Sequence, residues 1–240
     1  MQTGQARITY LVHSGFSVET ARHFFLFDYC PSMDRTPQIT AEFLRTKENI
    51  YVFASHSHGD HFDAAILKWA EANPAIQYVL STDIRVKDGG QKCQFMNPYE
   101  QWRDGELVVR SFGSTDAGIS FWLDVDGLAI FHAGDLNWWH WSGETQAERD
   151  YADRYFFEEM DLLPKQPLDI AFFPVDRRLE ENYALGAEYF AKKMQPKLLV
   201  PMHFGADFAA TAAFKQKVAG TGLATVEISR KGQVIDFPVV

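Results

Sequence analysis

The sequence predicts an α/β protein built as a layered sandwich of sheets and helices. Three observations favour this fold class: apolar runs of strand length recur along the chain, the first runs follow one another as hairpins, and later ones alternate with helical segments. The chain has 240 residues, of which 46% are hydrophobic and 23% are charged. This composition is typical of globular proteins and excludes disordered and fibrous chains. We expect a single domain over residues 1–240, because no linker-like or low-complexity stretch divides them.

Nine segments rich in β-branched and aromatic residues are predicted as strands. They are residues 7–12, 23–28, 49–55, 75–81, 106–111, 118–125, 128–132, 168–174 and 197–202. The first two are expected to pair as a hairpin. Another hairpin is expected at Asp126-Gly127, because a tight primed turn needs residues that tolerate positive φ. A last β-pair is expected to close the chain around Lys231-Gly232.

Three helices are predicted among these strands. They cover residues 62–72, 183–194 and about 207–219. In the first helix, Ala65, Ile66 and Trp69 would share one apolar face, and the following Asn-Pro pair would end the helix.

The charge of the chain restricts its partners. The formal net charge is −9, and a surface of that sign repels phosphate backbones, so no nucleic-acid partner is expected. A small anionic substrate remains compatible with it. Two cysteines, Cys30 and Cys93, are too few for a disulfide scaffold and fit a reducing compartment. No signal-peptide core and no apolar run of about 20 residues is present, so we expect a cytoplasmic protein outside the membrane. The oligomeric state is left open.

The most informative segment is a histidine–aspartate cluster at the junction of a predicted strand and a predicted helix. In extended geometry His56 and His58 point to the same side and can bind one ion. Asp60 and His61 follow Gly59, a residue that allows a sharp turn, and can bind a second ion beside the first. The alternative is a surface loop that holds three histidines by chance, which is improbable because the whole chain has only 8. Imidazole and carboxylate donors suit zinc, iron, manganese or nickel.

The pattern His-x-His-x-Asp-His after a strand resembles the metallo-β-lactamase superfamily. The resemblance implies a four-layer αβ/βα sandwich with one or two divalent ions at its edge, zinc being the first choice. Residues 131–137 resemble the strand-end aspartate motif, which implies that Asp135 bridges the ions, and residues 200–205 resemble the late histidine motif, which assigns His203 to the second ion. Residues 8–19 resemble the branch that holds ascorbate-6-phosphate lactonase-like proteins and uncharacterised hydrolases.

One departure from the superfamily pattern concerns the third histidine of the first ion. No histidine lies between His61 and His132. In the equivalent stretch, residues 111–118, Gly113 or Ser114 falls at the expected place. Asp116 or His13 can substitute there, or the first site binds weakly or stays empty. Asp60, His61, Asp135 and His203 are therefore the better-supported ligands.

For most of the other polar residues, both a functional and a structural role are open. His13 and His132 can contact the substrate or orient a ligand, or can be buried structural histidines. His140 lies in the aromatic run 137–141, which can form a substrate wall or simply a packed loop. Asp28 is expected to anchor a loop. Arg177 and Arg178 after Asp176 can bind a phosphate or carboxylate, or can be solvated.

The ligand set predicts a metal-dependent hydrolase. A bound metal lowers the pKa of water from about 15.7 to about 7, and Asp60 would orient this nucleophile and take its proton. The substrate would be a small ester, lactone or phosphoester. The missing histidine leaves open a non-catalytic, single-metal sensor or degenerate member. A nuclease is disfavoured by the charge, and an oxygen-reducing di-iron centre is disfavoured because that branch has a glutamate where this chain has His58.

Overall fold

The computed structural model describes residues 4–87 and 92–239. The chain folds into two compact units. The first comprises Met1–Asn97 together with Arg230–Val240, and the second comprises Pro98–Ser229. The single domain expected over residues 1–240 stays a prediction.

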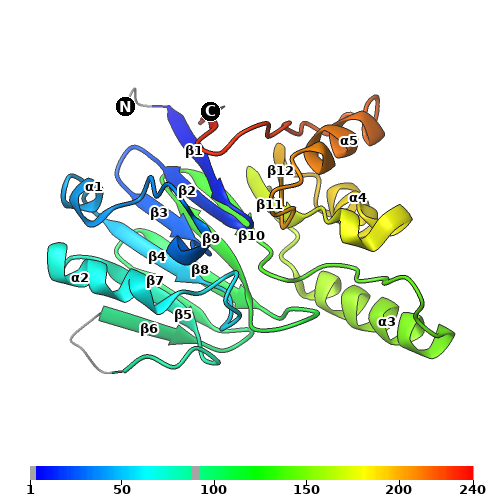
Figure 1. Ribbon diagram of the computed structural model, residues 1–240, viewed down its shortest axis with the longest axis horizontal. Coiled ribbons are helices and arrows are strands. Elements are labelled where there is room, and N and C mark those ends of the chain that lie inside the picture. The colour runs from blue at the N-terminus through cyan, green and yellow to red at the C-terminus, as the bar shows by residue number, and fades with distance from the viewer. Residues whose placement is uncertain (1–3, 88–91, 240) are drawn as a thin grey trace. The chain divides into compact units, whose positions relative to one another are not determined.

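The first unit is built on a seven-stranded mixed sheet with the order β13-β1-β2-β3-β4-β5-β6 (Figure 1). Four neighbours, β3 to β6, run parallel, and the remaining pairs are antiparallel. The strands are β1 (Gln5–Val12), β2 (Gly15–Glu19), β3 (Phe24–Phe27), β4 (Ile50–Ala54), β5 (Gln77–Ser81), β6 (Lys92–Met96) and β13 (Val234–Pro238).

Two predicted pairings in this sheet are wrong. The expected hairpin of residues 7–12 with 23–28 does not form, because β2 lies between β1 and β3 and pairs with both. The connection is long enough for a full strand with a tight turn at each end. The expected β-pair around Lys231-Gly232 is also wrong, since β13 pairs with β1 and Gly232 N donates to Tyr10 O at 2.9 Å. The partner of the last strand is thus the first one.

Short helices connect the parallel strands of the first unit. They are η1 (Pro31–Met33), α1 (Ala41–Arg45), η2 (Ala64–Lys68) and α2 (Trp69–Ala72). The helix predicted at 62–72 is therefore a 3₁₀ turn followed by one α turn. A 3₁₀ helix aligns residues i and i+3. Accordingly Ile66 and Trp69 are buried with Val52 in one apolar cluster, while Ala65 is exposed, contrary to the expected face.

The second unit contains a six-stranded mixed sheet with the order β12-β11-β10-β9-β8-β7. Its strands are β7 (Gln101–Asp104), β8 (Leu107–Phe112), β9 (Ser120–Val125), β10 (Leu128–His132), β11 (Ile170–Pro174) and β12 (Leu198–Met202). The hairpin predicted at Asp126-Gly127 is confirmed, with φ of 52° and 77° at the two turn residues. The last three strands in the chain order, β10 to β12, are parallel.

Helices α3 (Gln146–Leu162), η3 (Arg177–Asn182), α4 (Leu185–Met194) and α5 (Ala209–Lys217) complete the second unit. Helix α4 packs on the parallel strands through Phe190, whose ring centroid lies 5.2 Å from that of Phe131 and 4.5 Å from that of Phe173. Helix α3 was not predicted. Its local signal is the capping box of Thr145 and Glu148, in which each side chain bonds the backbone N–H of the other.

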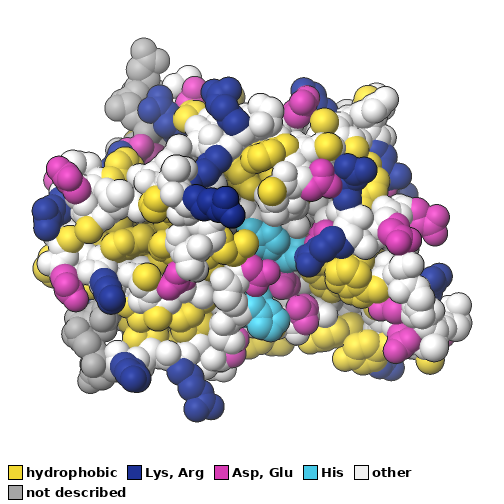
Figure 2. Space-filling view, viewed as in Figure 1, with side chains coloured by type: hydrophobic (Ala, Val, Ile, Leu, Met, Phe, Trp, Pro, Cys, Tyr) yellow, Lys and Arg dark blue, Asp and Glu magenta, His cyan; other side chains and the backbone are white. Residues whose placement is uncertain are grey.

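On the face drawn in Figure 2, Lys and Arg side chains lie scattered among acidic and apolar side chains. Among residues 4–87 and 92–239, no helix combines the length and apolarity that crossing a membrane requires.

Candidate metal centre

In the first unit, polar residues follow the carboxyl ends of three neighbouring parallel strands. Asp28 follows β3, Ser55 follows β4, and Asp83 comes shortly after β5. Ser55 N donates to Asp28 Oδ1 at 2.7 Å, and Ser57 N donates to Asp83 Oδ2 at 2.9 Å. These two carboxylates hold the start of the histidine segment at the edge where parallel sheets commonly place their ligands.

His61 is held by a buried carboxylate. Its Nδ1 lies 2.7 Å from Asp28 Oδ2, and neither side chain is exposed to solvent. A carboxylate at one ring nitrogen sets the tautomer and aims the other nitrogen, Nε2, which would then be the metal ligand. Asp28 therefore does more than anchor a loop. Its φ of 40° lies in the left-handed region, where a non-glycine residue is strained.

The other members of the motif also come together. The ligand atoms of His56, His58 and Asp60 lie within 4.8 Å of one another. The distance from His56 Nε2 to His58 Nδ1 is 3.0 Å. They meet without the expected extended geometry, because β4 ends at Ala54 and the chain bends after it. The turn does not require glycine at position 59 either. The φ of Gly59 is outside the left-handed region, and a Cβ atom placed on it would have no other atom within 4 Å.

His13 lies beside the proposed base. It forms the turn between β1 and β2 with a φ of 52°, and its Nε2 is 3.4 Å from Asp60 Oδ2. The hydrogen bond with His13 outweighs partial burial and holds the pKa of Asp60 well below its usual range. Two ligand atoms that each lie about 2.0–2.2 Å from a tetrahedral zinc ion are about 3.3–3.5 Å apart. The distance between His13 Nε2 and Asp60 Oδ2 is therefore that of two ligands of the same ion.

The second unit has a corresponding arrangement at the ends of its own parallel strands. Asp135 follows β10, Asp176 follows β11 and His203 follows β12, and all three are buried. His203 Nδ1 lies 2.9 Å from Asp176 Oδ2, and His203 Nε2 lies 3.3 Å from Asp135 Oδ1. The first contact orients the ring, and the second again has the spacing of two ligands on one tetrahedral ion.

Arg178 completes the support of His203. Its Nε and Nη2 both donate to the carboxylate of Asp176, at 2.9 Å and 2.5 Å to Oδ2. Burial alone would raise the pKa of Asp176, but the hydrogen bonds from His203 and Arg178 outweigh it and keep that pKa well below its usual range. Sequence reasoning missed the role of Asp176. The available signal was its position two residues after the end of an apolar strand, close to the strand-end position that Asp28 occupies.

In residues 111–118, the stretch that lacks the third histidine, the backbone of Gly113 contacts the buried side chain of Glu159. Gly113 N donates to Glu159 Oε2 at 3.1 Å, and a Cβ at position 113 would overlap the Glu159 carboxylate. A side chain at position 113 would therefore require the Glu159 carboxylate to move. Ser114 is buried and its hydroxyl accepts from Asp116 N at 3.4 Å. Asp116 is exposed, and one of its carboxylate oxygens lies within 4.8 Å of a carboxylate oxygen of Asp135.

The two remaining candidate histidines bond to other parts of the second unit. His132 is fully buried, and its Nδ1 accepts from Gly134 N at 3.2 Å, in the turn that leads to Asp135. His140 Nε2 lies 2.6 Å from Asp153 Oδ1, which also accepts from Trp138 Nε1 at 2.6 Å. This shared carboxylate ties the aromatic run to α3.

The aromatic run 137–141 also contacts two predicted metal ligands. Trp139 Nε1 donates to Asp135 O at 3.0 Å, and its ring meets that of His203 edge-on, with centroids 5.4 Å apart. Trp141 stacks on Trp139 at 5.7 Å with an interplanar angle of 5°. The rings therefore restrict the positions of Asp135 and His203.

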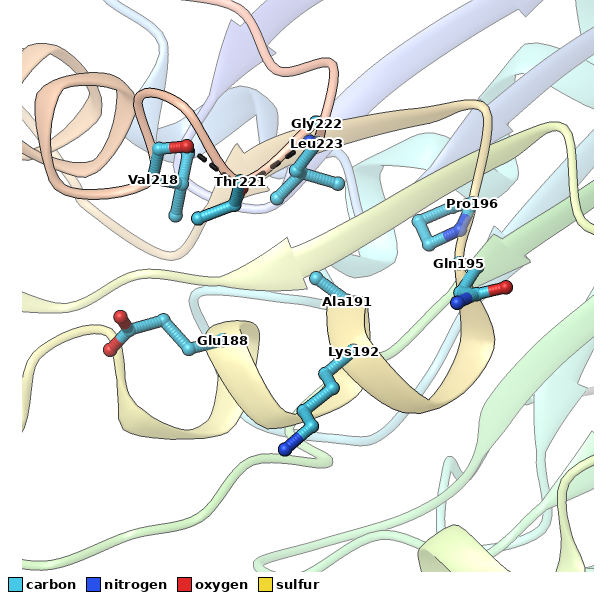
Figure 3. A pocket seen from close by; sticks show the side chains of 9 residues that line it. All are labelled: Glu188, Ala191, Lys192, Gln195, Pro196, Val218, Thr221, Gly222 and Leu223. Atoms are coloured by element: carbon cyan, nitrogen blue, oxygen red, sulfur yellow. Dashed lines mark hydrogen bonds between the residues drawn. The ribbon is translucent and has the colours of Figure 1, made fainter.

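A separate groove of about 530 Å³ lies between α4 and the turn that follows α5 (Figure 3). Its described lining contains no histidine or cysteine, and Glu188 is its one carboxylate. It shares no residue with the predicted ligands, so the metal chemistry is not assigned to it.

Comparisons with known proteins find relatives whose names describe metal-dependent hydrolases. In a scan against protein-family models, none matches the chain. Two relatives are UPF0173 metal-dependent hydrolases. That of Pyrococcus abyssi is 26% identical over 214 residues, covering 82% of this chain and 84% of the relative, and that of Pelotomaculum thermopropionicum is 23% identical over 253 residues, covering 96% and 100%.

Solved structures agree on the fold. A metallo hydrolase from the archaeon Ignicoccus hospitalis matches with a TM-score of 0.68 and 21% identity, covering 97% of this chain and 98% of that one. YhfI from Bacillus subtilis, a metallo-β-lactamase fold protein, matches with a TM-score of 0.61 and 14% identity, covering 97% and 99%. These structures show that the chain has the metallo-β-lactamase fold. The predicted fold class, an α/β sandwich of this type with two mixed sheets, is confirmed. In sequence the chain is similar to UPF0173 metal-dependent hydrolases, while its own ligands and base stay predictions.

Proposed function

We propose that this protein is a metal-dependent hydrolase that cleaves a small ester, lactone or phosphoester with a metal-activated water. The observation that carries the proposal is the set Asp176–His203–Asp135. In it, a buried carboxylate orients the ring at 2.9 Å, and the opposite ring nitrogen lies 3.3 Å from a second carboxylate. Such a pair has the donors and spacing of zinc ligands. The names of the UPF0173 relatives support the same reaction class.

The proposal includes one or two divalent ions. In the first unit the proposed ligands are His56, His58, Asp60 and His61, and in the second unit they are Asp135 and His203. Support for this ligand set comes from the resemblance to the superfamily, whose members draw their ligands from these motifs. Zinc is the first candidate for this nitrogen and oxygen donor set, with manganese, iron and nickel as alternatives.

Asp60 would act as the base. A metal bound by these residues would lower the pKa of water and so make hydroxide available at neutral pH. The hydrogen bond with His13 keeps the Asp60 carboxylate ionised and able to orient the nucleophile, and the same lowered pKa makes Asp60 a weak base that would pass the released proton on rather than hold it. Its side chain is 41% exposed, so the proton can leave to solvent. Asp28 and Asp176 would keep the ligand rings aimed throughout.

The test measures metal content and turnover on the same preparation. We expect bound zinc or another divalent ion, and turnover of a panel of lactones, esters and phosphodiesters that a chelator abolishes and the metal restores. Asp60→Asn should remove most of the turnover. Asp236→Asn, at an exposed carboxylate paired with Arg7, is the matched control and should keep it. Full turnover in Asp60→Asn would contradict the assignment of the base.

A second candidate function is a non-catalytic, single-metal sensor or degenerate member. The Glu159 carboxylate beside Gly113 supports it, because this carboxylate fills the space that a side chain at position 113, one of the two expected places of the third histidine, would need. Stoichiometric metal without turnover across the whole panel would favour this candidate over the hydrolase.

The expected partner is a small molecule in the cytoplasm. The net charge of −9 and the scattered basic side chains support the absence of nucleic-acid binding, and two free cysteines fit a reducing compartment. Salt-sensitive binding of RNA or DNA in a filter assay would contradict this.

A further inference from the structure

Next to His203, the second unit presents an exposed guanidinium and an exposed indole together. We call Arg178 and Trp141 the arginine–tryptophan platform. The side chain of Arg178 is 62% exposed and Trp141 is 37% exposed. The guanidinium carbon lies 5.8 Å from the centroid of the indole ring, which is a cation–π distance. A solute can therefore reach both groups at one place.

Both halves of the platform are rigidly attached to the predicted metal ligands. The guanidinium is fixed by its two-pronged contact with the buried Asp176, and its Nη2 lies 3.4 Å from His203 Nδ1. The indole stacks on Trp139, which in turn packs against His203. Exposed arginines and tryptophans elsewhere lose side-chain entropy when they bind a solute. These two are already ordered, so they would lose little.

The chemistry of the pair indicates what would bind. The Nε–Nη2 edge of the planar guanidinium donates to Asp176, so a carboxylate or phosphate oxygen would bind at its outer N–H groups. The exposed part of the Trp141 indole would contact a flat, unsaturated group beside that oxyanion. Each member of the platform contacts a carboxylate. Asp176 forms ion pairs with Arg178 and His203, and Glu144 accepts from Trp141 N at 2.9 Å. Neighbouring Arg177 is the contrasting case, because it contacts Asp207 at 3.4 Å on an exposed surface and none of the described aromatic rings forms a cation–π contact with it.

We propose that the arginine–tryptophan platform binds an oxyanion, a carboxylate or phosphate group, carried on a flat part of the substrate. The inference rests on the proposed function, since it places the substrate beside His203, and it narrows the substrate to an anionic one. Arg178 would then have two contacts, one to Asp176 as a positioning residue and one to the substrate as a specificity residue.

The experiment measures the binding of simple probes to the metal-loaded, full-length protein by calorimetric titration. Phenyl phosphate and benzoate carry both features, inorganic phosphate carries only the charge, and phenol only the ring. We expect the two-feature probes to bind tighter than either single-feature probe. Arg178→Gln should weaken phenyl phosphate about tenfold, the effect of one charge-assisted contact, and Arg178→Lys should restore part of the loss. Trp141→Ala should weaken it about threefold to tenfold.

Arg177→Gln is the matched control and should bind every probe as the wild type does. Metal content is measured on each variant, and any variant with less metal is titrated again after reloading, which separates the platform from metal ligation. Equal affinity of Arg178→Gln and wild type for phenyl phosphate would overturn the inference, and so would an equal loss in Arg177→Gln. Binding as expected in a protein that hydrolyses nothing would leave the inference standing and refute the hydrolase. Hydrolysis with no preference for anionic substrates would support the hydrolase and overturn the platform as the anion site.

Discussion

Asp176→Asn is the sharpest test of how the second unit holds its ligand. In the wild type both carboxylate oxygens accept from donors: Oδ1 from Arg178 N at 3.0 Å and Oδ2 from His203 Nδ1 at 2.9 Å. An amide has one oxygen, so whichever way Asn is turned, its NH2 group faces a donor. In either orientation His203 loses its charged partner, which weakens the preference for the tautomer that aims Nε2 at Asp135.

Two independent estimates of the free-energy cost of this substitution agree. Losing a partner that orients a ligating histidine costs about 10–100-fold in metal affinity, which corresponds to about 1.4–2.8 kcal/mol. Replacing a charge-assisted hydrogen bond by a neutral one costs about 1–2 kcal/mol. We therefore expect the dissociation constant for zinc to rise about tenfold or more in Asp176→Asn.

The assay is zinc competition against a chromogenic chelator, with the melting temperature of the metal-free protein as the check on folding. Asp207→Asn is the matched control, because this exposed carboxylate of the same unit touches Arg177 and not His203. A zinc affinity in Asp176→Asn within about twofold of that in Asp207→Asn would refute the reasoning, since the orienting carboxylate would then contribute nothing.

Other substitutions test the remaining features. Asp28→Asn should also raise the zinc dissociation constant about tenfold or more in the same competition assay, because Asp28 supports His61 as Asp176 supports His203. Gly113→Ala should destabilise the fold by about 1–3 kcal/mol in urea unfolding, and most of this loss should vanish in a Glu159→Ala background, where the overlapping carboxylate is absent. Gly59→Ala should keep the melting temperature and the zinc affinity within error, since neither φ nor space requires glycine there. Because the pKa of Asp60 is lowered in the folded state, its contribution to stability is present above the unfolded pKa of about 3.9 and is lost as the pH falls through the lower folded value. The stability difference between wild type and Asp60→Asn should therefore change as the pH falls below about 4, where the wild-type carboxylate begins to lose this contribution, and a difference that stays constant over that acidic range would contradict the lowered pKa.

Much of the site follows from local sequence. The six residues from His56 to His61 place three imidazoles and a carboxylate so close in the chain that any turn brings their ligand atoms together, which is why His56, His58 and Asp60 converge even though the expected strand geometry is absent. The turn at Asp126-Gly127 is equally local, because it depends on the two residues that adopt positive φ.

Contacts between distant segments follow from the order of strands in the sheets, which local patterns do not specify. Asp28 and His61 are 33 residues apart, Asp176 and His203 are 27 apart, and Gly113 and Glu159 are 46 apart. Each of the two carboxylate–histidine pairs forms because neighbouring parallel strands end at the same edge, and the Gly113–Glu159 contact forms because α3 folds back on the strand end that precedes it. The amino-acid sequence alone thus determined which residue types can bind a metal. Only the tertiary structure decided which carboxylates aim the histidines and which one fills the space beside Gly113, since these outcomes depend on packing between segments far apart in the chain.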